Sequence, residues 1–532
     1  MRTVPGGRVV AGERAVAGGR AVAAVVAGAL PALAFPDPSL WWFAYIALVP
    51  WMLLIRTAPT GRRAALEGWL GGIGFLIAVH HWLIPSLHVF IVVLAALLGV
   101  LWAPWGWLVR RMLGGRPSTA RAAAAVAAVP SGWLMIELVR SWDALGGPWG
   151  LMGASQWQVP PALRLASVGG VWLVSLLVLA VNTAVTALIA VPTARRAAVG
   201  GAVACAVVTA AVWAWAPRPQ EYGRARVAIV QPGVHDGISG PERRFARGEE
   251  LTRSLAGRKL DLVVWGESSV GEDLREHPAL ADRLAALSRD VGADLLVNVD
   301  ARRVDASGRG GIYKSSVLVG PRGPTGAHYD KMRLVPFGEY IPARSLLGWA
   351  TSVGKAAPED RLRGTHQVVM DLPDGGPRIG PLICFETAFP DMSRQLARHG
   401  AQLLVAQSAT STFQNSWAPE QHASLGAVRA AESGRPMVHA TLTGVSAVYG
   451  ADGARIGPEL STRTSAAAVY DIPLARGSTL FVRYGDWAVY GAAGVLVALA
   501  ATEGVRRLRR PVRGPGAPPA RTAHGFSARP GH

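Results

Sequence analysis

Long apolar stretches are the feature that most constrains the fold of this 532-residue chain. About 20 apolar residues are enough for a helix to cross the hydrocarbon core of a bilayer. Seven such runs precede residue 217 and an eighth lies near the C-terminus: 20–35, 40–56, 67–86, 88–109, 122–140, 165–192, 197–215 and 486–504. Only 17% of the residues are charged, against about 25% in soluble domains, so the composition also predicts a membrane protein.

Arginine clusters flank alternate ends of these runs. They precede the first run, separate runs two and three, four and five, and six and seven, and follow the eighth, whereas the loops at 36–39 and 86–88 have no Lys or Arg. Because basic loops stay in the cytoplasm, eight crossings with both termini cytoplasmic are predicted. The same placement argues against nucleic-acid binding as the reason for the net charge of +19.

The orientation divides the chain into five parts. They are a cytoplasmic N-terminus (1–19), a membrane domain of seven helices (20–216), an extracytoplasmic domain (217–485), a last membrane helix (486–504) and a disordered basic tail (505–532). The extracytoplasmic part alternates short apolar strands with helical patterns at 278–290 and 420–434, which predicts an α/β layered domain. The expected strands are 226–231, 260–266, 293–299, 315–320, 378–385, 401–407 and 466–472.

Three reactive side chains lie in motifs of this domain: Glu267 follows the predicted strand 260–266, Cys384 lies near the end of the predicted strand 378–385, and Lys331 lies in "HYDKMRLVPFGEY" (328–340). The other cysteine of the chain, Cys205, lies in an apolar run and is interpreted as a packing residue. Taken singly, each of the three has an ordinary structural interpretation, as a helix cap, a solvated lysine or a small buried thiol. Together they are complementary, because a thiol nucleophile needs a base and its oxyanion needs a positive charge.

The chemistry expected of this set is acyl transfer through a thioester. Glu267 would take the thiol proton of Cys384, and Lys331 together with a backbone N–H near Phe385 would stabilise the oxyanion. The acyl group would then pass to water or to an amine. The sequence has no spacing typical of metal ligands and no phosphate-binding glycine loop, so no metal and no cofactor are expected.

The motifs around these residues resemble a known family. "VVWGES" (263–268), "YDKMRLVPFGEYIP" (329–342) and "ICFE" (383–386) resemble the Glu, Lys and Cys motifs of the nitrilase, or carbon–nitrogen hydrolase, superfamily. With "GVSAVYG" and "FVRYGDW", and with "WLMIELVRSW" and "GPWGLMGASQ" in the membrane part, residues 20–505 resemble the apolipoprotein N-acyltransferases, the integral membrane branch of that superfamily.

The resemblance implies an αββα sandwich in a multi-pass protein of the bacterial plasma membrane. It implies transfer of the sn-1 acyl chain of a membrane phospholipid, through Cys384, to the α-amine of a diacylglyceryl-cysteine on a lipoprotein. It also implies that Glu339 and Glu386 are critical carboxylates near the triad; a second carboxylate could orient Lys331 or keep Glu267 protonated at the right moment. Tyr329 is a candidate for substrate binding, and Asp330 is its neighbour in the same motif. The alternative for Glu339 and Glu386 is an ordinary salt bridge in a loop.

Four residues of the membrane part are candidates for contact with lipid. Trp215 ends the last N-terminal run, where an interfacial anchor is favoured over a gate for lipid. His81 lies near the outer end of the third run. Glu137 and Arg140 are three residues apart on the fifth, as a fold-stabilising pair or as a site for a phospholipid headgroup.

Three departures from the family pattern bear on function. Gly266 replaces proline before Glu267, and Lys314 replaces asparagine. The segment 407–417 replaces a block common in the family, of which Phe413 alone matches the end. This loop is expected to contact substrate, with Phe413 as a candidate contact, so donor and acceptor preference is open. Two other functions remain open: a membrane-tethered amidohydrolase, in which water replaces the amine, and a catalytically silent membrane scaffold.

Overall fold

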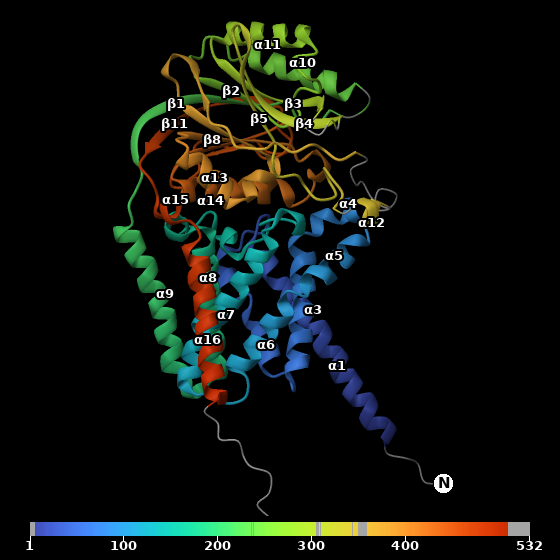
Figure 1. Ribbon diagram of the computed structural model, residues 1–532, viewed down its shortest axis with the longest axis vertical. Coiled ribbons are helices and arrows are strands. Elements are labelled where there is room, and N and C mark those ends of the chain that lie inside the picture. Colours follow the sequence, from blue (N-terminus) through green and yellow to red (C-terminus); the bar gives the residue numbers. More distant parts are fainter. Residues whose placement is uncertain are drawn as a thin grey trace, which may run out of the picture.

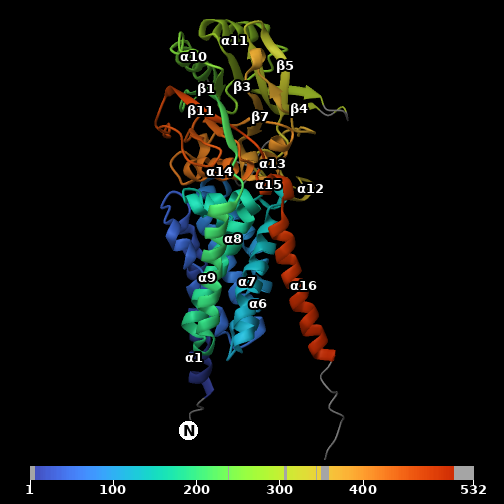
Figure 2. The ribbon, with the colours of Figure 1, turned by 90° about the vertical axis from the view of Figure 1, so that its left-hand side faces the viewer.

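The computed structural model describes residues 6–508, except for 236, 238, 305–307, 309, 343 and 349–358. It consists of a helical part and a part built on two β-sheets, which are stacked along the longest axis of the molecule (Figures 1 and 2). Residues 509–532 of the predicted tail, and residues 1–5, lie outside the described residues.

The helical part contains the predicted apolar runs. Its α-helices are α1 (Gly6–Ala29), α2 (Val49–Arg56), α3 (Gly61–Val79), α4 (Ile84–Leu87), α5 (Phe90–Gly99), α6 (Trp102–Leu113), α7 (Thr119–Arg140), α8 (Pro160–Ala190), α9 (Arg195–Trp215) and α16 (Trp487–Leu508). Side chains fix where two of them begin: the Thr60 and Ser118 hydroxyls accept hydrogen bonds from the backbone N–H groups of Arg63 and Arg121.

Several of these helices are long enough to span a membrane, although the predicted count of eight is not confirmed. Within the described residues, five apolar segments pass by length and composition: Val16–Ala34, Thr119–Arg140, Pro160–Ala190, Pro192–Trp215 and Trp487–Arg506. Two more pass if α3 with residues 81–87, and α5 with α6, each count as one bent span. The run predicted at 40–56 forms only a shorter apolar helix, Trp41–Arg56.

Close helix contacts and a tryptophan cluster hold the helical part together. A methyl group on Gly68 or Gly106 would collide with the backbone of the facing helix, so glycine lets α3 and α6 touch. Trp51, Trp102, Trp105 and Trp133 are fully buried, with ring centroids 4.9–6.0 Å apart. These four of the 19 tryptophans therefore pack in the interior and are not interfacial anchors; Trp133 meets the other three rings edge to face, and the Trp51 and Trp105 rings are tilted by 58°.

The start of α1 and the end of α16 lie at the same end of the helical part (Figures 1 and 2). The start of α1 and the end of α16 both point away from the sheets, and α9 leads from that end back to the first strand (Figures 1 and 2). The Arg111 guanidinium at the end of α6 bonds to Glu503 near the end of α16, 2.6 Å away.

The second part is a sandwich of two mixed sheets. The six-stranded sheet has the order β11 (Ala466–Arg476), β1 (Gln220–Gln231), β2 (Leu262–Trp265), β3 (Asp294–Val304), β4 (Gly310–Gly320), β5 (Gly323–Asp330). The five-stranded sheet has the order β10 (Ala447–Tyr449), β9 (Met437–Thr441), β8 (Leu403–Ser408), β7 (Arg378–Ile383), β6 (Met370–Asp371). β1, β2 and β3 run parallel, as do β7, β8 and β9, and the first and last strands, β1 and β11, pair antiparallel from Gln220↔Arg476 onward.

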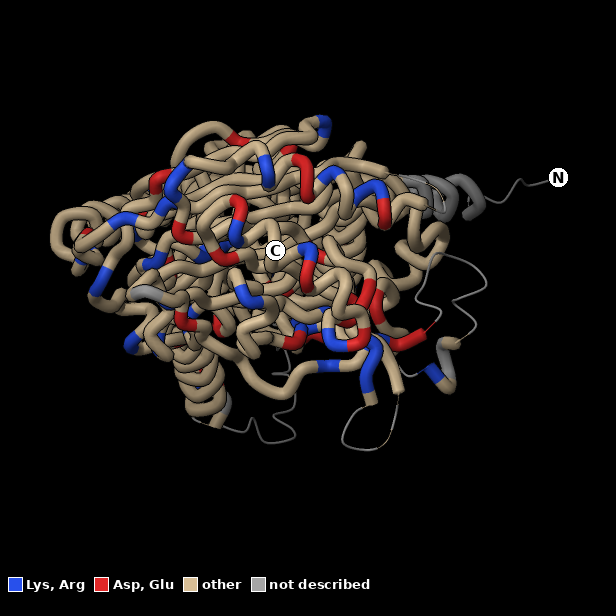
Figure 3. Tube along the Cα trace, turned by 90° about the horizontal axis from the view of Figure 1, so that it is seen from above, with Lys and Arg blue, Asp and Glu red and all other residues tan. Residues whose placement is uncertain are grey.

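The sheets face each other and helices cover their outer faces. Gln407 of β8 joins them, because its amide donates to the carbonyls of Trp265 and Leu296 and accepts from Ser316. Helices α10 (Gly240–Arg253) and α11 (Pro278–Val291) pack on the six-stranded sheet, and α13 (Pro390–Arg398) and α14 (Ala418–Ser433) lie between the other sheet and the helical part (Figure 1). Seen from the sheet end, acidic and basic residues are interspersed (Figure 3).

All seven predicted strands and both predicted helices are present in this sandwich, but β1 begins six residues before its predicted start, β4 begins five residues before, and β3 ends five residues after its predicted end. β5 and β9 were not predicted, and neither were α10 and α13. β5 reads "GPTGAHYD" and has little apolar character, so it is a strand because β4 pairs with it. The short edge strands β6 and β10 were missed too.

Candidate active site

Strand ends bring the three predicted residues together. Glu267 follows β2 after Gly266, Lys331 follows β5 directly, and Cys384 follows β7, so both sheets contribute. Gly266 fits because any side chain there would collide with the backbone at Thr441 and Leu442. Cys384 has a φ of 52°, a conformation that non-glycine residues rarely adopt, at the turn from strand β7 into the short helix 384–388.

Lys331 is the centre of a buried ionic cluster. Its ammonium group donates to Glu267 Oε1 at 3.0 Å and to Glu339 Oε1 at 2.8 Å, and its side chain is 1% exposed. The second oxygen of Glu339 accepts the backbone N–H of Val335 at 2.9 Å. Glu339 thus lies between the Lys331 ammonium group and the backbone N–H of Val335, and a role in orienting Lys331 stays a prediction.

The charges of the cluster set the protonation states of its members. Burial alone would raise the pKa of Glu267, but the Lys331 and Lys314 ammonium groups outweigh it and lower that pKa to about 2. Burial, together with the neighbouring Glu267 carboxylate, raises the pKa of Cys384 above its ordinary value, although Lys331 opposes this shift. The resting site therefore holds a carboxylate beside a neutral thiol.

Glu386 joins the loops that carry Lys331 and Cys384. Its Oε1 accepts the Tyr329 hydroxyl at 2.7 Å and the backbone N–H groups of Met332 and Arg333, and its Oε2 accepts the N–H of Ile383 at 2.8 Å. Burial raises the pKa of Glu386, while these hydrogen bonds oppose the rise. Tyr329 and Glu386 thus hold the two loops in register.

The residues beside Cys384 face the helical part. The Phe385 ring packs at right angles on Phe389, 5.0 Å between centroids, and both rings touch Gly147 of the loop after α7. His422 of α14, which the sequence analysis missed, lies 2.9 Å through Nε2 from the Cys384 carbonyl oxygen. Burial lowers the pKa of His422 to about 4, so its neutral ring donates to this carbonyl. No sequence pattern links it to Cys384.

The divergent segment 407–417 contacts the helical part. The Phe413 ring packs on Trp82 at 4.9 Å, and the Trp417 ring packs on His81 at 4.4 Å. The Gln421 side-chain oxygen, just beyond this segment, accepts from the indoles of both Trp82 and Trp149. Of the predicted substrate contacts, His81 and Phe413 therefore both lie at this junction.

Glu137 and Arg140 are both buried and each bonds to the loop that follows α7, while Glu137 also accepts the indole N–H of Trp133 at 3.0 Å. The Arg140 guanidinium donates to the Trp149 carbonyl at 2.7 Å, and Glu137 Oε1 accepts the N–H of Met152 at 2.7 Å. Arg140 also lies over the rings of Phe75 and Trp102. These contacts support a structural role in fixing residues 149–152, and the headgroup role stays a prediction.

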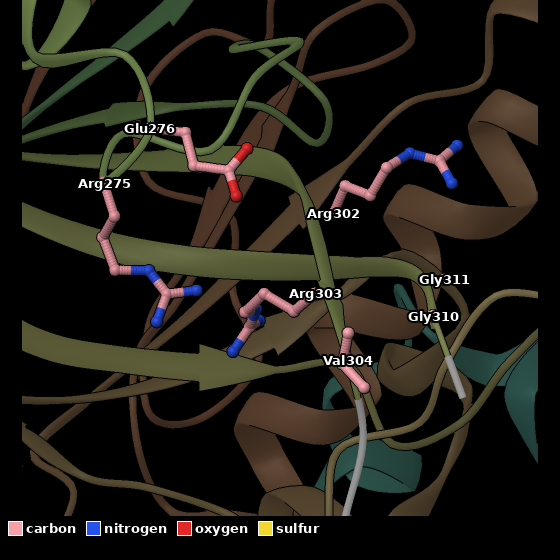
Figure 4. A pocket seen from close by; sticks show the side chains of 7 residues that line it. All are labelled: Arg275, Glu276, Arg302, Arg303, Val304, Gly310 and Gly311. Atoms are coloured by element: carbon pink, nitrogen blue, oxygen red, sulfur yellow. The ribbon is translucent and has the colours of Figure 1, made fainter. Parts of the chain in front are cut away.

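Trp215 and a separate hollow lie away from the cluster. The Trp215 side chain is 80% exposed at the end of α9, which fits an interfacial anchor. A hollow of about 630 Å³ opens at the β3–β4 hairpin, between Arg275, Arg302 and Arg303 (Figure 4). None of the three predicted catalytic residues lines it. Within the described residues, no three His, Cys, Asp or Glu side chains are placed to hold a metal ion.

Comparison with known proteins identifies the family. The family model "Apolipoprotein N-acyltransferase N-terminal domain" matches residues 27–184, and the model "Carbon-nitrogen hydrolase" matches residues 226–480. The apolipoprotein N-acyltransferase of Geobacter metallireducens is 30% identical over 90% of this chain and 94% of its own length. The chain belongs to the apolipoprotein N-acyltransferase family.

Two further likenesses accompany this assignment. The apolipoprotein N-acyltransferase of Azotobacter vinelandii is 31% identical over 92% of this chain and 96% of its own length. Among solved structures, a CN-hydrolase superfamily protein from Xanthomonas campestris is 19% identical, with a TM-score of 0.36, over 47% of this chain and 91% of that chain. The family assignment rests on the sequence relatives.

Proposed function

We propose that the chain moves an acyl group from a membrane phospholipid to the N-terminal amine of a diacylglyceryl-cysteine on a lipoprotein, with Cys384 as the carrier. The observation that carries the proposal is the buried cluster in which Lys331 bonds to both Glu267 and Glu339 beside the Cys384 thiol. The family supplies the reaction class, since its named members are N-acyltransferases.

The first step forms the thioester. Glu267 takes the proton of the Cys384 thiol as the sulfur attacks the ester carbonyl at the sn-1 position. Lys331 and a backbone N–H near Phe385 stabilise the oxyanion. The ester C–O bond then breaks, Glu267 returns the proton to the departing glycerol oxygen, and a lysophospholipid leaves. Because the pKa of the resting thiol is raised, proton transfer accompanies attack rather than preceding it.

The second step releases the acyl group. The lipoprotein amine attacks the thioester carbonyl, an amide C–N bond forms, and the C–S bond breaks. One amine proton passes through Glu267 to the Cys384 sulfur, which restores the resting site. Both substrates carry long chains, and the position of Phe385 and Phe413 against the helical part supports their access from the bilayer side.

Thioester formation can be tested by mass spectrometry. The protein, purified in detergent and incubated with phospholipid, should carry a fatty-acyl mass on the peptide containing Cys384 that neutral hydroxylamine removes. The Cys205 peptide serves as the internal control, and Cys384→Ala should show no such mass. A thiol that stays unmodified would contradict the proposal, and release of ammonia from small amides would then indicate the amidohydrolase.

The proposed topology places both termini in the cytoplasm and the sandwich outside. Its support is that the ends of α1 and α16 lie at the end of the helical part opposite the sheets (Figure 1). In a Cys384→Ala background, a membrane-impermeant maleimide applied to intact cells should label Glu250→Cys but not Arg62→Cys, both positions being exposed. Labelling of Arg62→Cys would contradict this orientation.

A further inference from the structure

A second lysine lies in the ionic cluster. Lys314 of β4 is the cross-strand neighbour of Lys331, because the Lys331 N–H donates to the Lys314 carbonyl at 2.9 Å beyond the pair Ser315↔Asp330. Two lysines in adjacent positions repel each other unless acidic groups lie between them. Both ammonium groups approach the same oxygen, Glu267 Oε1, at 3.0 Å from Lys331 and 3.6 Å from Lys314.

The other contacts of Lys314 fix its position. It faces Asp300 across the β3–β4 pairing, with its Nζ 3.4 Å from Asp300 Oδ1. Its Nζ also donates to the hydroxyl of Ser268, and that hydroxyl donates to Asp300 at 3.0 Å. The Lys314 side chain is 13% exposed, so the ion pairs are screened little by solvent.

The formal charges show what Lys314 adds. Glu267 and Glu339 carry two negative charges, which Lys331 alone would leave half compensated. With Lys314 the buried cluster is balanced, and Asp300 is the additional acid on its open side, 24% exposed. The remaining titratable neighbours of Glu267 are the Cys384 thiol and His422, whose pKa is lowered to about 4 by burial.

We propose that Lys314 is a positioning residue for acyl transfer: it holds Glu267 Oε1 together with Lys331, so that the carboxylate stays ionised and its other oxygen is left for the Cys384 thiol. This inference rests on the proposed function, in which Glu267 is the base. Lys314 replaces an asparagine expected from the family resemblance, so the second ammonium group distinguishes this chain from that pattern.

Electrostatics agree with this geometry. Burial alone would lower the pKa of Lys314, but the Glu267 and Asp300 carboxylates outweigh it and raise that pKa, so Lys314 stays charged. Lys314 is also one of the two cations that lower the pKa of Glu267. Removing its charge should therefore raise the pKa of Glu267 and protonate the base at a higher pH than in the parent.

The test is the rate of thioester formation in a single turnover, measured from about pH 2 to about pH 8 at several phospholipid concentrations, because the pKa of Glu267 is lowered to about 2. In Lys314→Met the rate should fall about tenfold near neutral pH, and its acid limb should lie about one pH unit above that of the parent. The phospholipid concentration giving half the maximal rate should not change, because Lys314 does not touch the donor in this scheme. Lys314→Arg should keep most of the rate and the parent profile.

Two further variants separate charge from folding. Lys314→Met/Asp300→Asn removes both partners of the cross-strand pair, so that the Asp300 carboxylate is not left without Lys314, and should show the same shift of the acid limb. Arg302→Met removes a cation from the neighbouring strand β3, where Arg302 meets the exposed Glu359, and should follow the parent. A Lys314→Met profile that coincides with the parent, or an equal loss in Lys314→Arg at every pH, would overturn the inference. A parent protein that forms no thioester would instead overturn the proposed function.

Discussion

The sandwich and the helical part both bury charge, but they use it differently. In the sandwich, the Lys331 ammonium binds two carboxylates, those of Glu267 and Glu339. In the helical part, Glu137 and Arg140 lie one turn apart on α7, yet Arg140 donates to the backbone carbonyl of Trp149, and Glu137 accepts the backbone N–H of Met152 and the indole of Trp133. Buried charge is costly in either place. The difference teaches that mutual pairing prepares a reactive site, whereas bonding to backbone holds an irregular loop.

The strongest test of this contrast is Lys331→Met. We expect thioester formation to fall by at least about a thousandfold, because the oxyanion loses its charge partner and two carboxylates are left facing each other. Single-turnover acylation measures the rate. Lys259→Met, a lysine on an exposed loop, is the matched control. A variant that keeps a tenth of the parent rate would remove Lys331 from the proposed mechanism.

Arg140→Met should lower the stability of the protein and leave the rate of acylation almost unchanged. Loss of the guanidinium leaves the Trp149 carbonyl without its donor and removes contacts with two aromatic rings, at a cost of about 3 kcal/mol in the free energy of unfolding. Acylation per folded molecule should stay within a few-fold of the parent. Thermal unfolding in detergent measures the change in stability. If activity fell while the unfolding midpoint held, headgroup binding by Arg140 would be favoured instead.

Arg429 and Glu432 of α14 form a further buried pair. It combines pairing between side chains with a bond to the backbone, so it extends the comparison. The two side chains are 3.0 Å apart, and Glu432 Oε1 also accepts the N–H of Val171 at a break in α8. Burial raises the pKa of Glu432 from 4.5 to about 7, although Arg429 opposes the rise. The folded protein therefore binds a proton that the unfolded chain releases.

The sign of the pH effect follows from this raised pKa. Between about pH 4.5 and about pH 7 the stability contributed by Glu432 should fall as pH rises, and above about pH 7 it should be constant. In Glu432→Gln this slope should vanish, while Glu250→Gln, at an exposed position of α10, should keep it. The unfolding midpoint at several pH values measures the slope. An unchanged slope in Glu432→Gln would mean that another group causes the pH dependence of stability.

The smallest effect is expected at Trp215. Because this side chain is 80% exposed, Trp215→Ala should change the free energy of unfolding by less than about 0.5 kcal/mol. Acylation should also stay close to the parent rate. A clear loss of rate with unchanged stability would favour the gate that the sequence left as an alternative.

Much of this architecture could be predicted from sequence because the signals are local. Apolar runs marked the membrane helices, and the strands that carry Glu267 and Cys384 are continuous apolar segments. Strand β5 was missed because its residues are polar and its pairing with β4 is a contact between distant positions. The bends between α3 and α4 and between α5 and α6 were not visible either, since the apolar runs continue through them.

For the site, motifs predicted the residues but not their partners. Glu339, eight positions after Lys331, was one of two candidates to orient it, and only the fold separates its role from that of Glu386. Lys314 could be noted as a departure from a pattern, but its distance to Glu267 depends on the pairing of β4 with β5. The roles assigned to these side chains stay predictions until the variants are measured.

The antiparallel pairing of β1 with β11 has an evolutionary consequence. The chain enters the sandwich at Gln220 and leaves it at Arg476, and these two residues are partners in one sheet. A domain whose ends lie side by side can be inserted between two consecutive helices of another protein without separating them. An ancestral soluble enzyme could thus have been captured whole, at a single site between α9 and α16, and placed on the membrane surface with its sheets already complete.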